Sequence, residues 1–298
     1  LMYGFIPNKS DAWAYTREAI RAYLKRGVTA DPGGGSLFDL AERNAPAPAV
    51  GEYLESARLL GRRTAELHRA LSCDSDDPVF RPEPFSPFIQ RGIYQSLRGL
   101  NQEVFGALAR RLPLLPPERR IEAQEIAGME ERIHDEFVAM RTVGFRASQI
   151  RCHGDYHLGQ VLWTGEDFFI IDFEGEPARS LTERRLKRSP FKDVAGMIRS
   201  FHYAAHSELG PNPDPVLENQ AIGWYRTVSA AFLRSYLEHA EGAVFMPSER
   251  GQRALLLRIF LLEKAVYELG YELDNRPDWS HIPIRGIRSL IDEFKGDA

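Results

Sequence analysis

Several polar side chains that could carry chemistry lie close together in the stretch RCHGDYHLGQVLW, residues 151–163. They are His153, Asp155, His157 and Gln160. A second carboxylate, Asp172, ends the apolar run that begins at Phe168. Such a set could form a metal site, an acid–base site or a network of structural hydrogen bonds.

The two carboxylates are the first pair to consider. If residues 161–163 and 168–173 pair as a hairpin, Asp155 and Asp172 face one cleft. One carboxylate could accept a proton from an attacking hydroxyl, while the other binds a hard cation such as Mg²⁺. Gln160 offers an amide oxygen as a further ligand, and His153 and His157 would order the loop by hydrogen bonds. A lone Asp at a strand end usually caps a turn, but the whole set at this spacing favours a functional site.

A metal-dependent phosphoesterase is an alternative interpretation of the same residues. His153, Asp155, His157 and Asp172 could ligate zinc or a similar ion that activates water. The remaining histidines downstream (His202, His206, His239 and His281) are scattered along helical patterns, where a packed or solvated role is the simpler expectation.

The elements that must position these residues are mostly helices. Apolar periodicity and capping residues predict helices at about 11–26, 51–71, 86–112, 117–141, 190–206, 218–241, 251–273 and 282–295. Short β-branched and aromatic runs predict strands at 149–152, 161–163 and 168–173. The Gly-rich segment 30–36 is expected to be a surface loop. We therefore predict a mainly α fold with a small antiparallel β insert within 149–173.

Composition excludes several classes of protein. The formal net charge of −4 gives no electrostatic reason to expect nucleic acid as the main partner. Cys73 and Cys152 are too few and too far apart for a disulfide framework. The most apolar helical run, 254–265, is interrupted by charged residues, so no membrane partner is expected. With no signal peptide visible, a cytoplasmic location is the default expectation.

At this point a family resemblance becomes specific. The string His153-Gly-Asp-Tyr-His-Leu-Gly-Gln160, followed by Ile171-Asp-Phe-Glu174, resembles the catalytic and metal-binding loops of aminoglycoside-phosphotransferase-like kinases. Their usual form is HGD-x-H-x-x-N followed by D-x-E or D-x-D, so Gln160 departs from the common Asn. The longer strings HGDYHLGQVL, IIDFEGEPARSLTERR and SPFKDVAGMIRSFHYAA resemble the maltokinase branch, which phosphorylates maltose with ATP to maltose 1-phosphate.

The resemblance implies ATP and Mg²⁺ as cofactors and a role for each matching residue. Asp155 matches the catalytic base, with His153 and His157 beside it in the catalytic loop 151–163. Gln160 and Asp172, at the metal loop 170–176, match the metal- and nucleotide-binding positions. Glu174 and Asp193 match structural supports of these loops. Phe5 and Ile6, in the run Phe5-Ile-Pro-Asn8, look like the hinge that contacts the nucleotide.

The resemblance also implies a domain organisation. Residues 1–10 would be the hinge to an N-terminal β lobe that is absent here, and residues 11–298 would form the kinase-like C-terminal lobe. That missing lobe carries the loop and lysine that hold the phosphates, so this segment alone is expected to be inactive. Related kinases occur fused to trehalose synthase, which makes a fused trehalose synthase domain a possible partner in cis. A non-catalytic kinase-like module is a further alternative, against which the intact Asp155 and Asp172 argue.

One helix face suits a sugar. Within the run 263–277, six residues fall inside an arc of roughly 140°: Lys264, Tyr267, Glu268, Tyr271, Glu272 and Asn275. Carboxylates and an ammonium group can bond sugar hydroxyls, and tyrosines can pack on pyranose rings. Without the resemblance, a solvated face with Lys264–Glu268 pairs would be the simpler interpretation. With it, the first five of these residues are expected to bind maltose or a related disaccharide.

Overall fold

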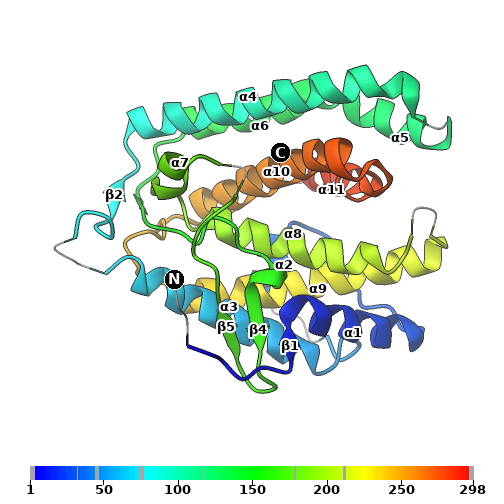
Figure 1. The fold of residues 1–298 in the computed structure, drawn as a ribbon, viewed down its shortest axis with the longest axis horizontal. Coiled ribbons are helices and arrows are strands. Elements are labelled where there is room, and N and C mark those ends of the chain that lie inside the picture. Colours follow the sequence, from blue (N-terminus) through cyan, green and yellow to red (C-terminus); the bar gives the residue numbers. More distant parts are fainter. Residues whose placement is uncertain are drawn as a thin grey trace. The chain divides into compact units, whose positions relative to one another are not determined.

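The computed structural model describes residues 4–31, 33–43, 47–73, 77–115, 117–177, 179–210 and 213–294. The chain divides into two compact units (Figure 1). The first comprises residues 1–71, 151–186 and 196–241, and the second comprises residues 72–150, 187–195 and 242–298. Each unit is therefore assembled from separate parts of the sequence.

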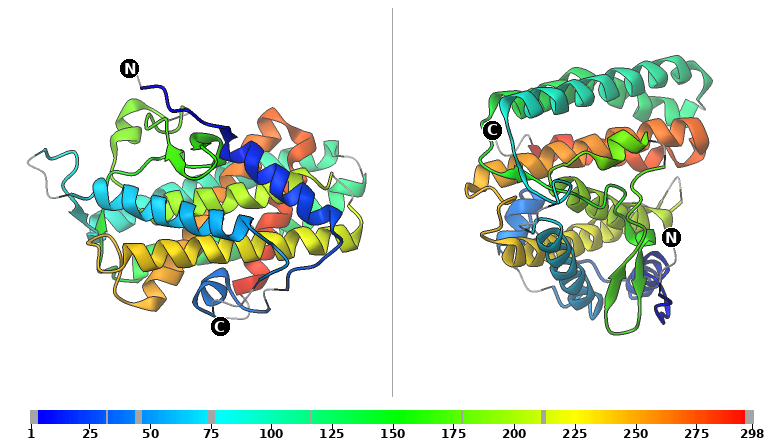
Figure 2. Two further views of the ribbon diagram at one scale, coloured as in Figure 1. Left: turned by 90° about the horizontal axis from the view of Figure 1, so that it is seen from below. Right: turned by 60° about the vertical axis from the view of Figure 1, so that its left-hand side comes forward.

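The first unit holds the polar motif. Its elements are β1 (Ser10–Asp11), α1 (Ala12–Lys25), α2 (Leu37–Arg43), α3 (Tyr53–Ala70), the 3₁₀ turn η2 (Leu158–Gln160), β4 (Val161–Trp163), β5 (Phe168–Ile170), α7 (Leu181–Arg185), most of α8 (Phe191–Ser207) and α9 (Pro215–Ala240). Helices α3 and α9 lie side by side over much of their length (Figure 2). Gly61 permits this approach, because a Cβ there would meet the Phe232 carbonyl oxygen.

The second unit is a bundle of long helices. Its elements are β2 (Glu83–Pro84), α4 (Pro87–Arg111), η1 (Leu112–Leu114), α5 (Pro117–Ala127), α6 (Glu130–Thr142), β3 (Ser148–Gln149), the first turn of α8, α10 (Arg250–Asn275), η3 (Pro277–Trp279) and α11 (His281–Phe294). Helix α4 packs against α6 and α10, and α10 packs against α11 (Figure 1). Leu108, Phe137, Leu262 and Ile287 are buried in this bundle.

Capping residues explain where helices α1, α4 and α9 begin. The Asp11 side chain accepts from the Ala14 N–H at 2.7 Å and so caps α1, as its sequence position predicts. Ser86 caps α4, which has Pro87 in its first turn, and Asp214 caps α9 in the same way.

The hairpin expected from residues 161–173 is present. Strands β4 and β5 pair antiparallel with Leu162 opposite Phe169, and their turn ends in a bond from the Thr164 N–H to the Asp167 carbonyl. Strand β1 adds to the other edge of β4, with Ser10 opposite Trp163. A second small sheet pairs β2 with β3. The prediction of a mostly helical fold with small antiparallel sheets is confirmed.

Some element boundaries differ from the sequence-based prediction. The single helix expected at 117–141 is two helices, because α5 ends at Ala127 and α6 begins at Glu130. The short helices α2 and α7 were not expected. The strand expected at 149–152 is limited to Ser148–Gln149, and β5 ends at Ile170, two residues before Asp172. Lys295, the expected last residue of the final helix, and residues 1–3 of the expected hinge lie outside the described residues.

No helix within the described ranges combines the length and the apolar character that crossing a membrane requires.

Candidate functional site

The β4–β5 hairpin brings Gln160 and Asp172 together. These residues flank the two strands, and the Ile171 N–H donates to the Gln160 carbonyl at 3.0 Å, which closes the open end of the hairpin. The Gln160 side chain then donates through Nε2 to Asp172 Oδ2, also at 3.0 Å. The amide and the carboxylate proposed as metal ligands are therefore direct neighbours, although twelve positions separate them in the chain.

Asp172 has an unusual backbone. Its φ is +63°, and no other non-glycine residue in the described part of the chain has a positive φ. This left-handed conformation is costly for a residue with a Cβ, and such residues concentrate at functional sites. The turn redirects the chain directly after β5, where the carboxylate is exposed to solvent. The conformation is an independent sign that this position is specialised.

The predicted base, Asp155, lies in the loop that leads into η2. Its side chain is about one-fifth exposed, so it is partly shielded but still reachable. His157 Nε2 lies 3.9 Å from Asp155 Oδ2. The other ring nitrogen of His157, Nδ1, accepts from the Gly159 N–H at 3.1 Å. That bond caps η2 and holds the imidazole beside the carboxylate.

His153 ties the loop of Asp155 to the loop of Asp172. It is buried, with 1% of its surface exposed. Its Nε2 bonds the Ile171 carbonyl at 2.8 Å, and its Nδ1 accepts from the Asp155 N–H at 3.4 Å. Because a carbonyl only accepts, Nε2 carries the proton. The same imidazole thus contacts the backbone next to each of the two carboxylates.

The catalytic loop is also held from behind by α3 and α8. The hydroxyl of the buried Tyr156 bonds Thr64 Oγ1 at 2.9 Å, and the Leu158 N–H donates to Ser200 Oγ at 3.1 Å. A Cβ at Gly196 would lie 2.6 Å from the Tyr156 carbonyl oxygen, so α8 reaches the loop only because this residue is glycine.

Sequence reasoning did not identify Thr64, Gly196 or Ser200. The available signal was an isolated glycine inside a strong helical pattern, which commonly marks close packing.

An ion pair fixes the far end of the hairpin. Arg63 on α3 grips Asp167 through two bonds, Nε to Oδ1 at 2.8 Å and Nη2 to Oδ2 at 2.6 Å. The Arg63 guanidinium holds the pKa of the Asp167 carboxyl below its usual range. Bidentate geometry makes this pair more specific than a typical surface pair.

The other predicted site residues of the kinase loops are placed as follows. Phe5 is 87% exposed and Ile6 is half-buried, in an extended segment that joins the sheet where the Lys9 N–H donates to the Trp163 carbonyl. Glu174 is exposed, two residues after Asp172. Asp193 is buried in the first turn of α8 and belongs to the second unit. Their assigned roles stay predictions.

The predicted sugar-binding residues all lie on α10 in the second unit, but they are not equally accessible. Tyr271 is 46% exposed. The Lys264 Nζ lies over the Tyr267 ring, 4.9 Å from its centroid. Glu268 and Glu272 are buried, and Arg276 holds Glu272 with bonds of 3.0 and 2.7 Å. Asn275 is exposed and donates to the Tyr271 carbonyl. The helix therefore offers an open tyrosine above two shielded carboxylates.

The donor set favours a hard cation over a histidine-rich metal centre. Within the described residues, no three His, Cys, Asp or Glu side chains gather as a metal-binding cluster. His153, one of the ligands that a phosphoesterase would need, bonds the Ile171 carbonyl instead. One carboxylate and one amide oxygen, from Asp172 and Gln160, fit Mg²⁺, which commonly takes one or two carboxylates with water and substrate phosphates as further ligands.

Comparison with curated proteins finds relatives that are named as sugar kinases. A glucosamine kinase of Mycolicibacterium smegmatis is 29% identical over 151 residues, 47% of this chain and 34% of the relative. A glucosamine kinase of Streptacidiphilus jiangxiensis is 21% identical over 97% of this chain and 57% of its own length. The chain therefore spans little more than half of these curated relatives at most. Both are named glucosamine kinases, so the expected maltokinase branch and trehalose synthase fusion gain no support from them.

Solved structures agree on the fold. A glucosamine kinase in complex with glucosamine, ADP and inorganic phosphate matches with a TM-score of 0.72 and 19% identity, covering 98% of this chain and 64% of that one. A glucosamine kinase structure described as crystal form A gives a TM-score of 0.72 with 20% identity, covering 98% of this chain and 62% of that one. The family profile described as "Phosphotransferase enzyme family" (APH) matches residues 27–175, which is half of the chain and includes Asp155, Gln160 and Asp172. The chain belongs to this phosphotransferase enzyme family.

Proposed function

We propose that this segment forms the catalytic lobe of an ATP-dependent sugar kinase. The observation that carries the proposal is the juxtaposition of the Gln160–Asp172 pair with the Asp155 loop, which His153 ties together. In phosphoryl transfer, catalysis consists mostly of positioning and charge neutralisation. Two loops bonded to one another through a buried imidazole suit that requirement.

Asp155 acts as the general base. It accepts the proton of the attacking sugar hydroxyl, whose oxygen forms a bond to the γ-phosphorus while the bond from that phosphorus to the bridging oxygen of ADP breaks. His157 restricts the Asp155 side chain, since its ring lies against the carboxylate and is anchored to the Gly159 N–H. His153 sets the backbone of both loops.

Asp172 and Gln160 hold the cation. When bound, Mg²⁺ with its nucleotide supplies charge neutralisation for the transferring phosphoryl group. The left-handed backbone at Asp172 turns the carboxylate out of the strand direction, and the bond to Gln160 limits its rotation. The family resemblance implies a further β lobe that holds the phosphates, and the proposal includes it. The proposed activity is therefore that of a protein with both lobes, not of this chain alone.

The proposed substrate is a glucose-type sugar. The names of the relatives make glucosamine the first candidate, while the motif strings that resemble maltokinases make maltose the second. Helix α10 supports either one, since Tyr271 offers an exposed ring and Glu268, three residues earlier on the same helix face, offers a carboxylate. An amino sugar carries an ammonium group that a carboxylate would favour over a neutral hydroxyl.

The test is a coupled measurement of sugar-dependent ADP release by the full-length gene product, with glucosamine, maltose and glucose offered separately. Asp155→Asn keeps the shape but removes the base, so kcat should fall about a hundredfold or more. Asp172→Asn should do at least as much damage. Glu166→Gln, an exposed change in the turn of the same hairpin, is the matched control and should leave kcat unchanged.

The outcomes separate the competing functions. Full turnover in Asp155→Asn would refute the proposed mechanism. Phosphate release from p-nitrophenyl phosphate without any sugar dependence would favour the phosphoesterase. If no sugar is phosphorylated by a folded full-length protein that binds ATP, the non-catalytic module is the better description.

A further inference from the structure

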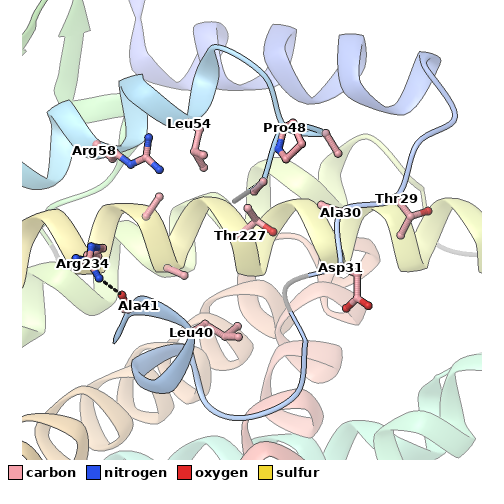
Figure 3. A pocket seen from close by; sticks show the side chains of 14 residues that line it. Thr29, Ala30, Asp31, Leu40, Ala41, Pro48, Leu54, Arg58, Thr227 and Arg234 are labelled. Atoms are coloured by element: carbon pink, nitrogen blue, oxygen red, sulfur yellow. Dashed lines mark hydrogen bonds between the residues drawn. The ribbon is translucent and has the colours of Figure 1, made fainter. Parts of the chain in front are cut away.

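Helix α3 carries hydroxyl side chains along a face that packs against other parts of the first unit. Tyr53, Ser56 and Thr64 lie within an arc of roughly 80° at about 100° per residue, and each forms a side-chain bond to another segment. The cavity shown in Figure 3 lies beside a different face of α3, since Leu54 and Arg58 line it and none of the three hydroxyl residues does. The three hydroxyls therefore serve contacts within the protein.

Thr64 is the member of this set that reaches the catalytic loop. It is buried, and its Oγ1 donates to the Leu60 carbonyl at 2.8 Å and lies 2.9 Å from the Tyr156 hydroxyl. A threonine hydroxyl carries a single proton and a carbonyl only accepts, so the phenol of Tyr156 donates to Thr64. Tyr156 is also buried and directly follows Asp155 in the chain. The bond therefore attaches the residue next to the proposed base to α3.

The ring of Tyr156 connects this support to the loop of the second carboxylate. Its centroid lies 5.3 Å from that of the His153 ring, and the Phe173 ring lies 5.1 Å from the same imidazole. His153 in turn bonds the Ile171 carbonyl, one residue before Asp172. Because protein interiors are close-packed, a displaced Tyr156 ring displaces the imidazole as well. The position of Tyr156 therefore affects both loops of the candidate site.

A second pair in the first unit has the same chemistry away from the catalytic loop. Thr16 on α1 donates to the Ala12 carbonyl at 2.6 Å, and its Oγ1 lies 2.5 Å from the hydroxyl of Tyr53, the first residue of α3. Thr16 and Tyr53 are buried, as Thr64 and Tyr156 are. The same proton count makes Tyr53 the donor to Thr16. The two pairs thus allow a matched comparison, in which the same kind of bond is removed with and without an attached catalytic loop.

We propose that Thr64 is a positioning residue for phosphoryl transfer, which acts by holding the catalytic loop through the phenol of Tyr156. The inference rests on the proposed kinase function, in which this loop carries Asp155 as the base. Anchoring the loop at Tyr156 keeps the carboxylate in place relative to the attacking hydroxyl, and the rate depends strongly on such placement. Sugar binding is assigned to α10 and depends less on Thr64. Removing the bond should therefore lower kcat more than it raises KM for the sugar.

The first measurement is sugar-dependent ADP release by the full-length protein. Thr64→Val and Tyr156→Phe should each lower kcat about three- to tenfold, the value of one buried hydrogen bond. The double variant should fall no further than the larger single effect, because all three variants lose the same bond. Thr64→Ser keeps the hydroxyl and should retain at least about half of the wild-type kcat. The KM for the sugar should change less than about twofold in every variant.

The second measurement does not depend on activity. Hydrogen exchange, followed by mass spectrometry, reports on the peptide that spans residues 151–163 in the full-length protein. Its amides include that of Leu158, which donates to Ser200 Oγ. They should exchange about three- to tenfold faster in Thr64→Val and in Tyr156→Phe than in the wild type. Tyr156→Phe keeps the ring, so it decides the outcome if Thr64→Val does not fold.

Thr16→Val and Tyr53→Phe are the matched controls. They should lower the melting temperature about as much as the Thr64 and Tyr156 variants, while kcat and the exchange of the loop stay within about twofold of the wild type. An equal fall of kcat in the controls, unchanged loop exchange in Thr64→Val and Tyr156→Phe, or faster exchange with unchanged kcat overturns the proposal. A wild-type protein that phosphorylates no sugar refutes the kinase function instead, and loop exchange alone then decides whether Thr64 holds the loop.

Discussion

The backbone at Asp172 allows a test that separates folding from function. Its φ of +63° lies in the left-handed region, which costs an L residue about 1–2 kcal/mol because Cβ crowds the following carbonyl oxygen. Asp tolerates the region better than most residues, since its short polar side chain can bond locally. Here that side chain accepts from Gln160. We therefore compare Asp172→Gly with Asp172→Ala.

The expected difference can be estimated from the structure. Both variants lose the carboxylate and the same bond to Gln160, so that contribution cancels between them. Glycine escapes the left-handed penalty of about 1–2 kcal/mol, but its freer unfolded chain costs about 0.5–1 kcal/mol. The free energy of unfolding should thus be about 0.5–1 kcal/mol higher for Asp172→Gly than for Asp172→Ala.

Urea unfolding of the chain, followed by circular dichroism, measures this difference. Glu174 provides the matched control, because it is exposed, lies two residues further on and has no positive φ. There the order should reverse, with Ala more stable than Gly. Equal or greater stability of Asp172→Ala would refute the strained backbone. In the full-length protein, the rate of sugar phosphorylation should fall at least about a hundredfold in both Asp172 variants. An active Asp172→Gly enzyme would refute the role of Asp172 in binding the cation.

Two other predictions concern the supports of the site. Gly196→Ala must widen a contact of 2.6 Å with the Tyr156 carbonyl oxygen beyond 3.0 Å, and ordinary van der Waals contact starts at 3.4 Å, so the shift is about 0.4–0.8 Å. Because misplacement of a catalytic group by about 1 Å can cost a hundredfold in rate, kcat for the preferred sugar should fall about 10- to 100-fold. Gly99→Ala is the control: a Cβ at this position would meet no atom within 4 Å, so this variant should keep full activity. Asp167→Asn removes a carboxylate whose pKa is lowered by Arg63, so its stabilisation is present at neutral pH and is lost as pH falls through the lowered pKa. Urea unfolding from neutral to acid pH should show the wild-type advantage shrinking, and a constant difference would contradict the ion pair.

The sequence predicted the long helices well because each one carries a sustained apolar period, and α1, α4 and α9 also begin at a capping side chain. The side-chain cap at Asp11 and the proline in the first turn of α4 are examples of helix starts that local chemistry determines. The hairpin was also predictable, since its two strands are adjacent in the chain. In contrast, α2 has seven residues and α7 has five, too short for a period to be recognised. The break between α5 and α6 falls at Gly128 and Met129, inside a stretch whose apolar pattern predicts one helix.

Long-range contacts were beyond the sequence. The motif identified which polar residues to examine, but its spacing says nothing about the contact of Tyr156 with Gly196 or with Thr64, which lies 92 positions away. Strand β1 is equally invisible, because only two residues pair with β4 and they continue directly into a helix. The buried carboxylates on α10 show the same limit. Periodicity placed Glu272 on the helix face, whereas its burial, with 1% of its surface exposed, depends on the fold.

The geometry of the catalytic loop explains why histidines occupy two positions of the motif. Both imidazoles make the same local bond, in which Nδ1 accepts the backbone N–H two residues later, Asp155 for His153 and Gly159 for His157. Nδ1 can accept only when it carries no proton, so the bond fixes the tautomer and directs Nε2 outward. At His153 that nitrogen reaches the Ile171 carbonyl, and at His157 it faces the Asp155 carboxylate. Acting as a proton carrier would disrupt the bond that shapes the loop. The two histidines therefore serve as positioning residues, and the proton of the substrate hydroxyl is left to Asp155.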